Sequence, residues 1–203
     1  MGLRVGVFGG SFNPIHIGHL IVAEEARCRL RLDRVIFIPA GQPPHKDAGG
    51  LAPAADRYDL VRLAIADNPA FEASDIEIRR PGRSYTVDTL AALRKSLPRG
   101  SKLFLIVGQD SVAEMKTWRE PRKILSLAEL VVAGREGIDP AALKALRPMM
   151  PRKAHPVVLE TRIGVSATEI RERLARGETA RYLVPEATLE AIGRRGLYGV
   201  SRC

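Results

Sequence analysis

Two histidines beside a glycine-rich segment are the residues best suited to chemistry in this sequence. His16 and His19 are three positions apart and follow Gly9, Gly10 and Ser11. Residues three apart in a helical turn project to the same side, so we expect both imidazoles to face one ligand. Neutral imidazoles can donate hydrogen bonds to phosphate oxygens. That suits phosphoryl or nucleotidyl transfer, in which catalysis is mainly positioning and charge stabilisation.

The same segment permits two other interpretations. A glycine-rich turn that simply begins a helix needs no ligand. The pair His16-x-x-His19 could also bind a metal ion, but there is no obvious third ligand near it, so we predict no metal site. No Gly-Lys-Ser/Thr follows the glycines, which excludes a P-loop. Glycines after a strand let the backbone approach a phosphate, and the N-terminus of the next helix favours the same anion.

Apolar runs alternate with amphipathic runs along the chain, which is typical of α/β proteins. The apolar runs predict strands at residues 3–8, 35–38, 76–79, 103–107, 130–133 and 157–159. The amphipathic runs predict helices at residues 18–31, 56–67, 86–96, 166–176 and 185–195. This alternation implies a mostly parallel sheet with right-handed crossovers. We therefore expect a Rossmann-like, doubly wound α/β fold with helices on both faces, forming one domain over residues 1–203.

The composition and net charge limit which classes of protein fit this sequence. A chain of 203 residues that is 45% hydrophobic can bury a sizeable core. The net charge of +9 fits a solvated basic surface, but also nucleic acid, an acidic membrane or an anionic small substrate. The only cysteines, Cys28 and Cys203, suggest no disulfide framework. No apolar stretch reaches 18 residues and no signal-peptide pattern is present. We predict a cytoplasmic protein that binds neither membrane nor nucleic acid.

Residues 9–20, Gly-Gly-Ser-Phe-Asn-Pro-Ile-His-Ile-Gly-His-Leu, resemble the signature of the nucleotidylyltransferase superfamily, and most closely its bacterial nicotinate-nucleotide adenylyltransferase family. Class I aminoacyl-tRNA synthetases share His-Ile-Gly-His, but they need a longer chain and a Lys-Met-Ser-Lys-Ser-type loop. The resemblance implies that His16 and His19 are catalytic and contact the ATP phosphates. It also implies that the backbone of four residues lies beside the nucleotides: Gly9, Gly10, Ser11 and Phe12.

Residues 84–90 match the family's Ser-Tyr-Thr-x-Asp-Thr-Leu, which implies that Tyr85, Thr86 and Asp88 bind the mononucleotide. The sequence independently predicts Thr86 as a helix N-cap with Asp88 in the first turn. The purely structural interpretation is a well-capped helix. The functional interpretation is that main-chain amides at the N-terminus of the helix that starts at Thr86 hold the pyridine carboxylate of the substrate.

Two further residues are assigned to the mononucleotide by resemblance. Residues 37–46 look like the family's loop after the second strand, in which Lys46 would bind the substrate phosphate as a mobile point charge. Alone, Lys46 would be read as a solvated loop lysine. Trp118, the only tryptophan, lies in a polar stretch where a core role is less natural. The family places a tryptophan here against the pyridinium ring, which an indole face attracts.

The resemblance also assigns ATP contacts after two later strands. Gly108 and Asp110 resemble the family's Gly-x-Asp, and Asp110 would meet the ribose. An N-cap of the next helix is the equal alternative for Asp110. Arg135 matches a family arginine, but Glu136 follows where the family usually has proline, so the shape of that loop is in doubt.

A last segment, Val-Ser-Ala-Thr-Glu-Ile-Arg, resembles the family's Ile-Ser-Ser-Thr-x-Ile-Arg. It implies that Ser166, Thr168 and Arg171 contact the ATP phosphates, whereas Ala167 removes one hydroxyl. Ser166 and Glu169 also form a capping-box pattern. An arginine in the first turns of a helix is unfavourable unless an anion lies there, which agrees with the implied role.

The implied reaction joins ATP and nicotinate mononucleotide, giving nicotinate adenine dinucleotide and pyrophosphate. Mg²⁺ would bridge the triphosphate, held largely by substrate oxygens and water. Enzymatic alternatives use nicotinamide mononucleotide or phosphopantetheine as acceptor. Alternatives of another class are a basic nucleic-acid-binding module and a nucleotide-binding protein without turnover. The sequence leaves a monomer and a small homo-oligomer both open.

Overall fold

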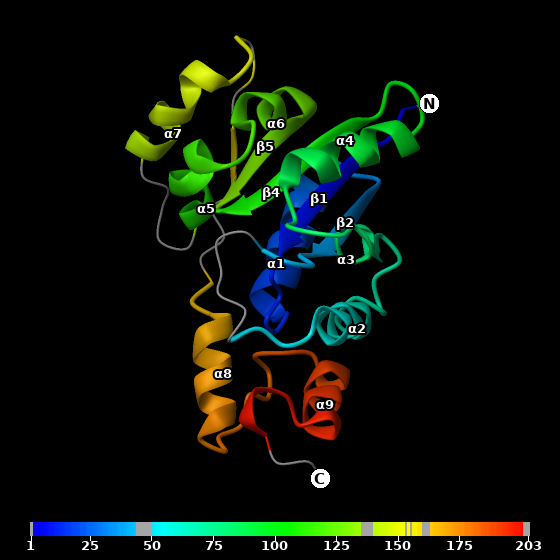
Figure 1. The fold of residues 1–203 in the computed structure, drawn as a ribbon, viewed down its shortest axis with the longest axis vertical. Coiled ribbons are helices and arrows are strands. Elements are labelled where there is room, and N and C mark those ends of the chain that lie inside the picture. The colour runs from blue at the N-terminus through cyan, green and yellow to red at the C-terminus, as the bar shows by residue number, and fades with distance from the viewer. Residues whose placement is uncertain are drawn as a thin grey trace.

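A six-stranded, wholly parallel sheet organises the chain (Figure 1). The computed structural model describes residues 2–43, 50–134, 140–152, 154, 156–159 and 163–200. The strands are β1 (Arg4–Gly10), β2 (Arg34–Pro39), β3 (Phe71–Ala73), β4 (Lys102–Gly108), β5 (Ala128–Ala133) and β6 (Val157–Leu159). Their order, β3-β2-β1-β4-β5-β6, is that of a Rossmann sheet, so the predicted doubly wound α/β fold is confirmed.

Helices cover both faces of this sheet. One core contains buried residues of α1 (Ile17–Leu30), α2 (Ala54–Ala64), α8 (Ala167–Ala175) and α9 (Glu186–Arg195). The other contains buried residues of α4 (Thr86–Ser96), α5 (Gln109–Glu114), α6 (Pro121–Leu127) and α7 (Pro140–Leu146). A short helix, α3 (Ile76–Arg79), precedes α4. Figure 1 shows α8 and α9 together at the end of the molecule that holds the C-terminus.

Strand β4 shows how the two cores share one sheet. Phe104 and Ile106 pack into the core with α1, whereas Leu103, Leu105 and Val107 pack into the core with α4. Successive side chains of a strand point to opposite faces. A strand covered on both faces must therefore be apolar at every position, which explains its unbroken apolar run.

One predicted element is wrong. Residues 76–79 were expected to form a strand but form α3, and the strand in this region is β3 instead. The amides of Ile78 and Arg79 both donate to the carbonyl of Asp75, at 2.9 Å each, and close a helical turn. Four residues that alternate Ile-Glu-Ile-Arg fit either structure, so periodicity cannot decide. Helices α5, α6 and α7 were not predicted, whereas α4 has the predicted bounds.

Within the described residues, every helix is too short or too polar to cross a membrane.

Candidate active site

A cavity of about 400 Å³ opens at the carboxyl ends of β1 and β4, where the strand order reverses. Ligands of doubly wound sheets bind at this switch point, and the volume is within the usual range for small-molecule sites. Gly9, Gly10 and Gly108 line it. A Cβ added to Gly9 or Gly108 would have no heavy atom within 4 Å. These two strand ends therefore leave open space in which a ligand can approach the backbone.

Phe12 packs the turn that follows β1. Its φ of 45° lies in the left-handed region, which is uncommon for a residue other than glycine. Its buried ring contacts Phe8, Phe37 and His19, the last edge-on with ring centroids 5.1 Å apart. The ring of Phe12 thus supports the loop and one histidine. Its contribution to a nucleotide site would come from its backbone, as the resemblance implied.

The two histidines meet at the start of α1 and both line the cavity. His16 is the N-cap residue, and the ring centroids of His16 and His19 are 3.8 Å apart. The main-chain amide of His16 donates to Nδ1 of His19 at 3.2 Å. Nδ1 of His19 is therefore an acceptor, and in the neutral ring Nε2 carries the proton. The expectation that both rings project to one side is confirmed.

Asn13 connects the histidine segment with two other parts of the site. Its buried side-chain amide donates to the Gly50 carbonyl at 2.7 Å and accepts from the Ala52 amide at 3.0 Å. Its own carbonyl accepts a hydrogen bond from Arg171 at 2.8 Å. Asn13 therefore holds the chain just after the loop that carries Lys46, which itself lies outside the described residues.

Arg57 connects the described residues on either side of the Lys46 segment with the turn after β1. Its guanidinium donates to the carbonyls of Ser11 and Ala40, at 2.6 Å each, and of Ala52, at 2.9 Å. The side chain is 1% exposed, and this burial lowers its pKa. The sequence analysis missed Arg57, because an arginine in a predicted surface helix carries no signal that it will be buried.

Tyr85, Thr86 and Trp118 also line the cavity, so the structure brings together the residues assigned to the pyridine ring. The prediction that Thr86 is the N-cap of α4 is wrong. Tyr85 occupies the N-cap position and Thr86 is the first helical residue. The amides of the first helical turn have no partner within the helix, and they can bind an anion here. Trp118 is half-buried against the core that contains α4.

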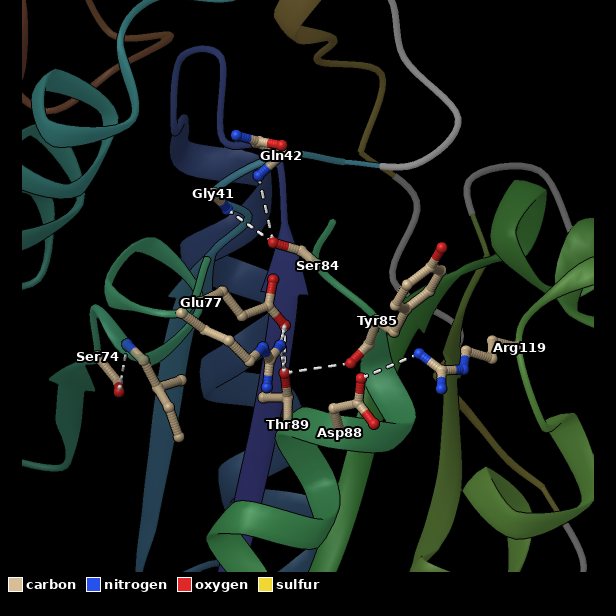
Figure 2. Close-up of polar contacts among 11 residues, drawn as sticks. Gly41, Gln42, Ser74, Glu77, Ser84, Tyr85, Asp88, Thr89 and Arg119 are labelled. Carbon is tan, nitrogen blue, oxygen red and sulfur yellow. Dashed lines mark hydrogen bonds and ion pairs between the residues drawn. The ribbon is translucent and has the colours of Figure 1, made fainter. Parts of the chain in front are cut away.

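Asp88 does not line the cavity. It forms an ion pair of 3.5 Å with Arg119, whose guanidinium lies 4.9 Å from the centroid of the Tyr85 ring. Figure 2 shows these side chains beside the start of α4. Asp88 is therefore linked to the cavity only through its ion pair with Arg119, which does line it.

A buried carboxyl group that the sequence analysis missed lies next to these residues. Glu77, on α3, lines the cavity and is 8% exposed. Burial raises its pKa, while hydrogen bonds from Thr89 and Ser84 and the nearby charge of Arg80 oppose that shift. An alternating Ile-Glu-Ile pattern predicts a surface glutamate, so no sequence signal marked it.

The residues implied to bind ATP are only partly brought together. Gly108 lines the cavity, but Asp110 is exposed, does not line it, and is the second residue of α5 rather than its N-cap. Arg135 lies outside the described residues.

Helix α8 provides the remaining residues implied to bind ATP. Ser166 is its N-cap and accepts from the Glu169 amide at 3.1 Å, as predicted. Arg171 donates to the hydroxyl of Thr168 at 3.3 Å besides its contact with Asn13. Of these residues, Arg171 contacts the turn after β1, and none of Ser166, Thr168 and Arg171 lines the cavity.

Within the described ranges, no group of three or more His, Cys, Asp or Glu side chains could hold a metal ion.

Comparisons with known proteins identify the family of this chain. The cytidylyltransferase-like family matches residues 7–173. A protein of Rubrobacter xylanophilus, named "Probable nicotinate-nucleotide adenylyltransferase", is 45% identical over 199 residues, covering 97% of this chain and 92% of the relative. A protein of the same name from a Roseiflexus species is 46% identical over 198 residues, covering 96% and 97%.

Solved structures resemble the fold. Nicotinic acid mononucleotide adenylyltransferase of Plasmodium falciparum, complexed with NaAD, superposes with a TM-score of 0.81 at 17% identity and 98% coverage of both chains. The same enzyme complexed with APC gives a TM-score of 0.78. At this identity the likeness supports the fold alone.

The chain therefore belongs to the cytidylyltransferase-like family of nucleotidyltransferases. Its relatives at 45–46% identity, which it matches over nearly their whole length, place it among the nicotinate-nucleotide adenylyltransferases of that family.

Proposed function

We propose that this enzyme transfers the adenylyl group of ATP to nicotinate mononucleotide, releasing pyrophosphate, as a step in NAD biosynthesis. One observation carries the proposal. A single cavity at the switch point contains a histidine pair beside open glycine strand ends, and also a helix N-terminus with an indole. The histidine pair and the glycine strand ends suit a triphosphate, whereas the helix N-terminus and the indole suit a pyridine carboxylate.

The chemistry requires positioning rather than a covalent intermediate. The phosphate of the mononucleotide has a second pKa of about 6, so it is mostly dianionic at neutral pH. It can therefore attack the α-phosphorus of ATP without a general base. His16 and His19 would donate hydrogen bonds to the phosphate oxygens, with His19 using Nε2. Lys46 and Arg171 would neutralise charge as pyrophosphate leaves.

We propose that Mg²⁺ accompanies ATP. When bound, it would neutralise charge on the triphosphate and on the leaving pyrophosphate. We expect it to be held mainly by substrate oxygens and water.

The start of α4 favours the acid over the amide form of the acceptor. A carboxylate at the N-terminal amides of α4, beginning with that of Thr86, gains from the helix dipole, whereas an uncharged carboxamide gains less. Trp118, in the same cavity, would stack on the pyridinium ring.

We also propose that residues 1–203 act as one domain, because both hydrophobic cores pack against the same sheet.

We propose further that the enzyme is cytoplasmic. The low cysteine content, and an exposed Cys28 that forms no disulfide, support a reducing compartment.

The test is pyrophosphate release with ATP and Mg²⁺, with nicotinate mononucleotide, nicotinamide mononucleotide and phosphopantetheine offered in parallel. Strong turnover with the first acceptor supports the proposal. Turnover with another acceptor alone would keep the chemistry but refute the assigned pyridine pocket. No turnover with any of the three, from folded protein that still binds ATP, would refute the enzymatic function.

A further inference from the structure

The buried carboxyl group of Glu77 lies where three segments of the site meet. Figure 2 shows it between Ser84, which precedes α4, and Thr89, on the first turns of α4. The hydroxyl of Thr89 donates to Oε1 of Glu77 at 2.6 Å and accepts from Arg80 at 2.8 Å. Glu77, Ser84 and Thr89 are all at least nine-tenths buried and all line the cavity.

Ser84 connects this group with the chain that follows β2. Its Oγ accepts from the amides of Gly41, at 3.0 Å, and of Gln42, at 3.3 Å. The amide of Ser84 donates in return to the Gln42 carbonyl at 2.9 Å. The backbones are too close here for a side chain, because a Cβ on Gly41 would lie 2.5 Å from the carbonyl oxygen of Glu77.

The direction of every hydrogen bond in this group follows from donor and acceptor counts. A hydroxyl has one proton and two lone pairs. Both lone pairs of Ser84 Oγ face backbone amides, so its proton can point toward the Glu77 carboxyl, whose pKa Ser84 helps to hold down. Thr89 accepts from Arg80, and its contact with Glu77 at 2.6 Å is much shorter than its contact with the Tyr85 carbonyl at 3.4 Å, so its proton points to Glu77. Glu77 is thus required only as an acceptor.

We infer that Glu77 is a positioning residue for the acceptor: by accepting from Thr89, beside Ser84, it holds the start of α4 where Ser84 binds the backbone of Gly41 and Gln42. The inference rests on the proposed function, since it assigns the Tyr85–Thr86 end of the cavity to the mononucleotide. Gly41 and Gln42 begin the segment that leads to Lys46. Glu77 therefore links the wall for the pyridine carboxylate with residues 41–42, the described part of the chain that precedes Lys46.

Glu77→Gln tests this with almost no change in shape. Glutamine presents one oxygen and one NH₂ where glutamate presents two oxygens. The NH₂ must then face the hydroxyl of Ser84 or Thr89, whose proton already points toward this side chain, so two donors oppose each other. The KM for nicotinate mononucleotide should rise by at least about tenfold, as expected when a buried hydrogen bond to a charged group is broken. The KM for ATP should stay within about twofold, and kcat should change much less than the acceptor KM.

The matched control is Glu72→Gln. Glu72 is on neighbouring β3, about half exposed, and pairs with Arg34 at 3.2 Å. It should leave both KM values unchanged. Trp118, the only tryptophan and a lining residue, gives a readout independent of turnover. Titration of its fluorescence with nicotinate mononucleotide should show the same loss of affinity in Glu77→Gln.

Thr89→Val keeps the side-chain shape and removes one of the two donors to Glu77, so it decides the question if Glu77→Gln does not fold. Its acceptor KM should also rise while the KM for ATP does not. In the double variant Glu77→Gln/Thr89→Val the two effects should be non-additive, because both break one network.

An unchanged acceptor KM, or an equal loss for ATP and acceptor, in an otherwise active enzyme would overturn the positioning role while leaving the proposed function intact. A wild-type enzyme that is inactive with nicotinate mononucleotide would instead refute the proposed function, and the assignment of Glu77 to this acceptor would be refuted with it.

Discussion

Replacing Arg57 with methionine should destabilise the protein by about 3 kcal/mol. The change leaves three carbonyl oxygens, one buried and two partly buried, which now accept at 2.6–2.9 Å, without this donor. Each unsatisfied acceptor costs roughly 1–3 kcal/mol. Methionine also removes the penalty of burying a cation, which is several kcal/mol and offsets part of the loss. The net cost is a large fraction of a total stability of roughly 5–15 kcal/mol.

Urea denaturation measures this loss. With an m-value of roughly 2–3 kcal/mol per molar, the midpoint should fall by about 1–1.5 M without a change in slope. Arg57→Lys should recover only part of the loss, because an ammonium group cannot reproduce the planar array of donors.

Arg62→Met is the matched control for Arg57. It lies on the same helix and its side chain is 64% exposed. Its contacts are long: an ion pair with Asp59 at 3.9 Å, and a guanidinium carbon 6.0 Å from the centroid of the Tyr58 ring. Its effect should stay within about 0.5 kcal/mol. If Arg57→Met and Arg62→Met give the same midpoint, the reasoning that the buried guanidinium holds the loop ends is refuted.

Three further outcomes are expected. His16→Ala and His19→Ala should each lower kcat by about 10²–10³-fold, the cost of removing a donor to developing charge, with unchanged circular dichroism; near-normal turnover in both would remove the catalytic assignment. Trp118→Ala should raise the KM for nicotinate mononucleotide by about tenfold, from lost stacking and cation–π attraction, and an unchanged KM would exclude that contact. Glu24 has its pKa lowered to about 2, chiefly by the hydrogen bond from Arg27. Because the folded-state pKa is lowered, the stabilisation is present above pH 4.5 and lost as pH falls towards 2. The difference in Tm between wild type and Glu24→Gln should therefore shrink between pH 7 and pH 3, and a constant difference would contradict the assignment.

Local sequence determined the elements and motifs that depend on near neighbours. The apolar run of β4 could only be a strand covered on both faces, and the bounds of α4 follow from its amphipathic pattern. The spacing of His16 and His19 was enough to predict that their rings project to one side. Ser166 was recognisable as an N-cap because its partner amide is only three residues away.

Where the local pattern was ambiguous, the prediction failed. The Ile-Glu-Ile-Arg of α3 satisfies strand and helix alike, and the contact with the Asp75 carbonyl decided for the helix. At the start of α4, a threonine that suits an N-cap was displaced into the first turn, and Tyr85 took the cap position.

Only the tertiary structure could identify Glu77 and Arg57 as parts of the site. Ser84, the partner of Glu77, bonds to Gly41, 43 residues away, and Arg57 reaches Ser11, 46 residues away. A charged side chain on a predicted surface element, here the strand that would carry Glu77 or the helix that carries Arg57, reads as solvated because isolated charges are rarely buried. These two are buried because packing of the sheet and its loops brings complementary donors and acceptors around them, and that match exists only once the distant segments have come together.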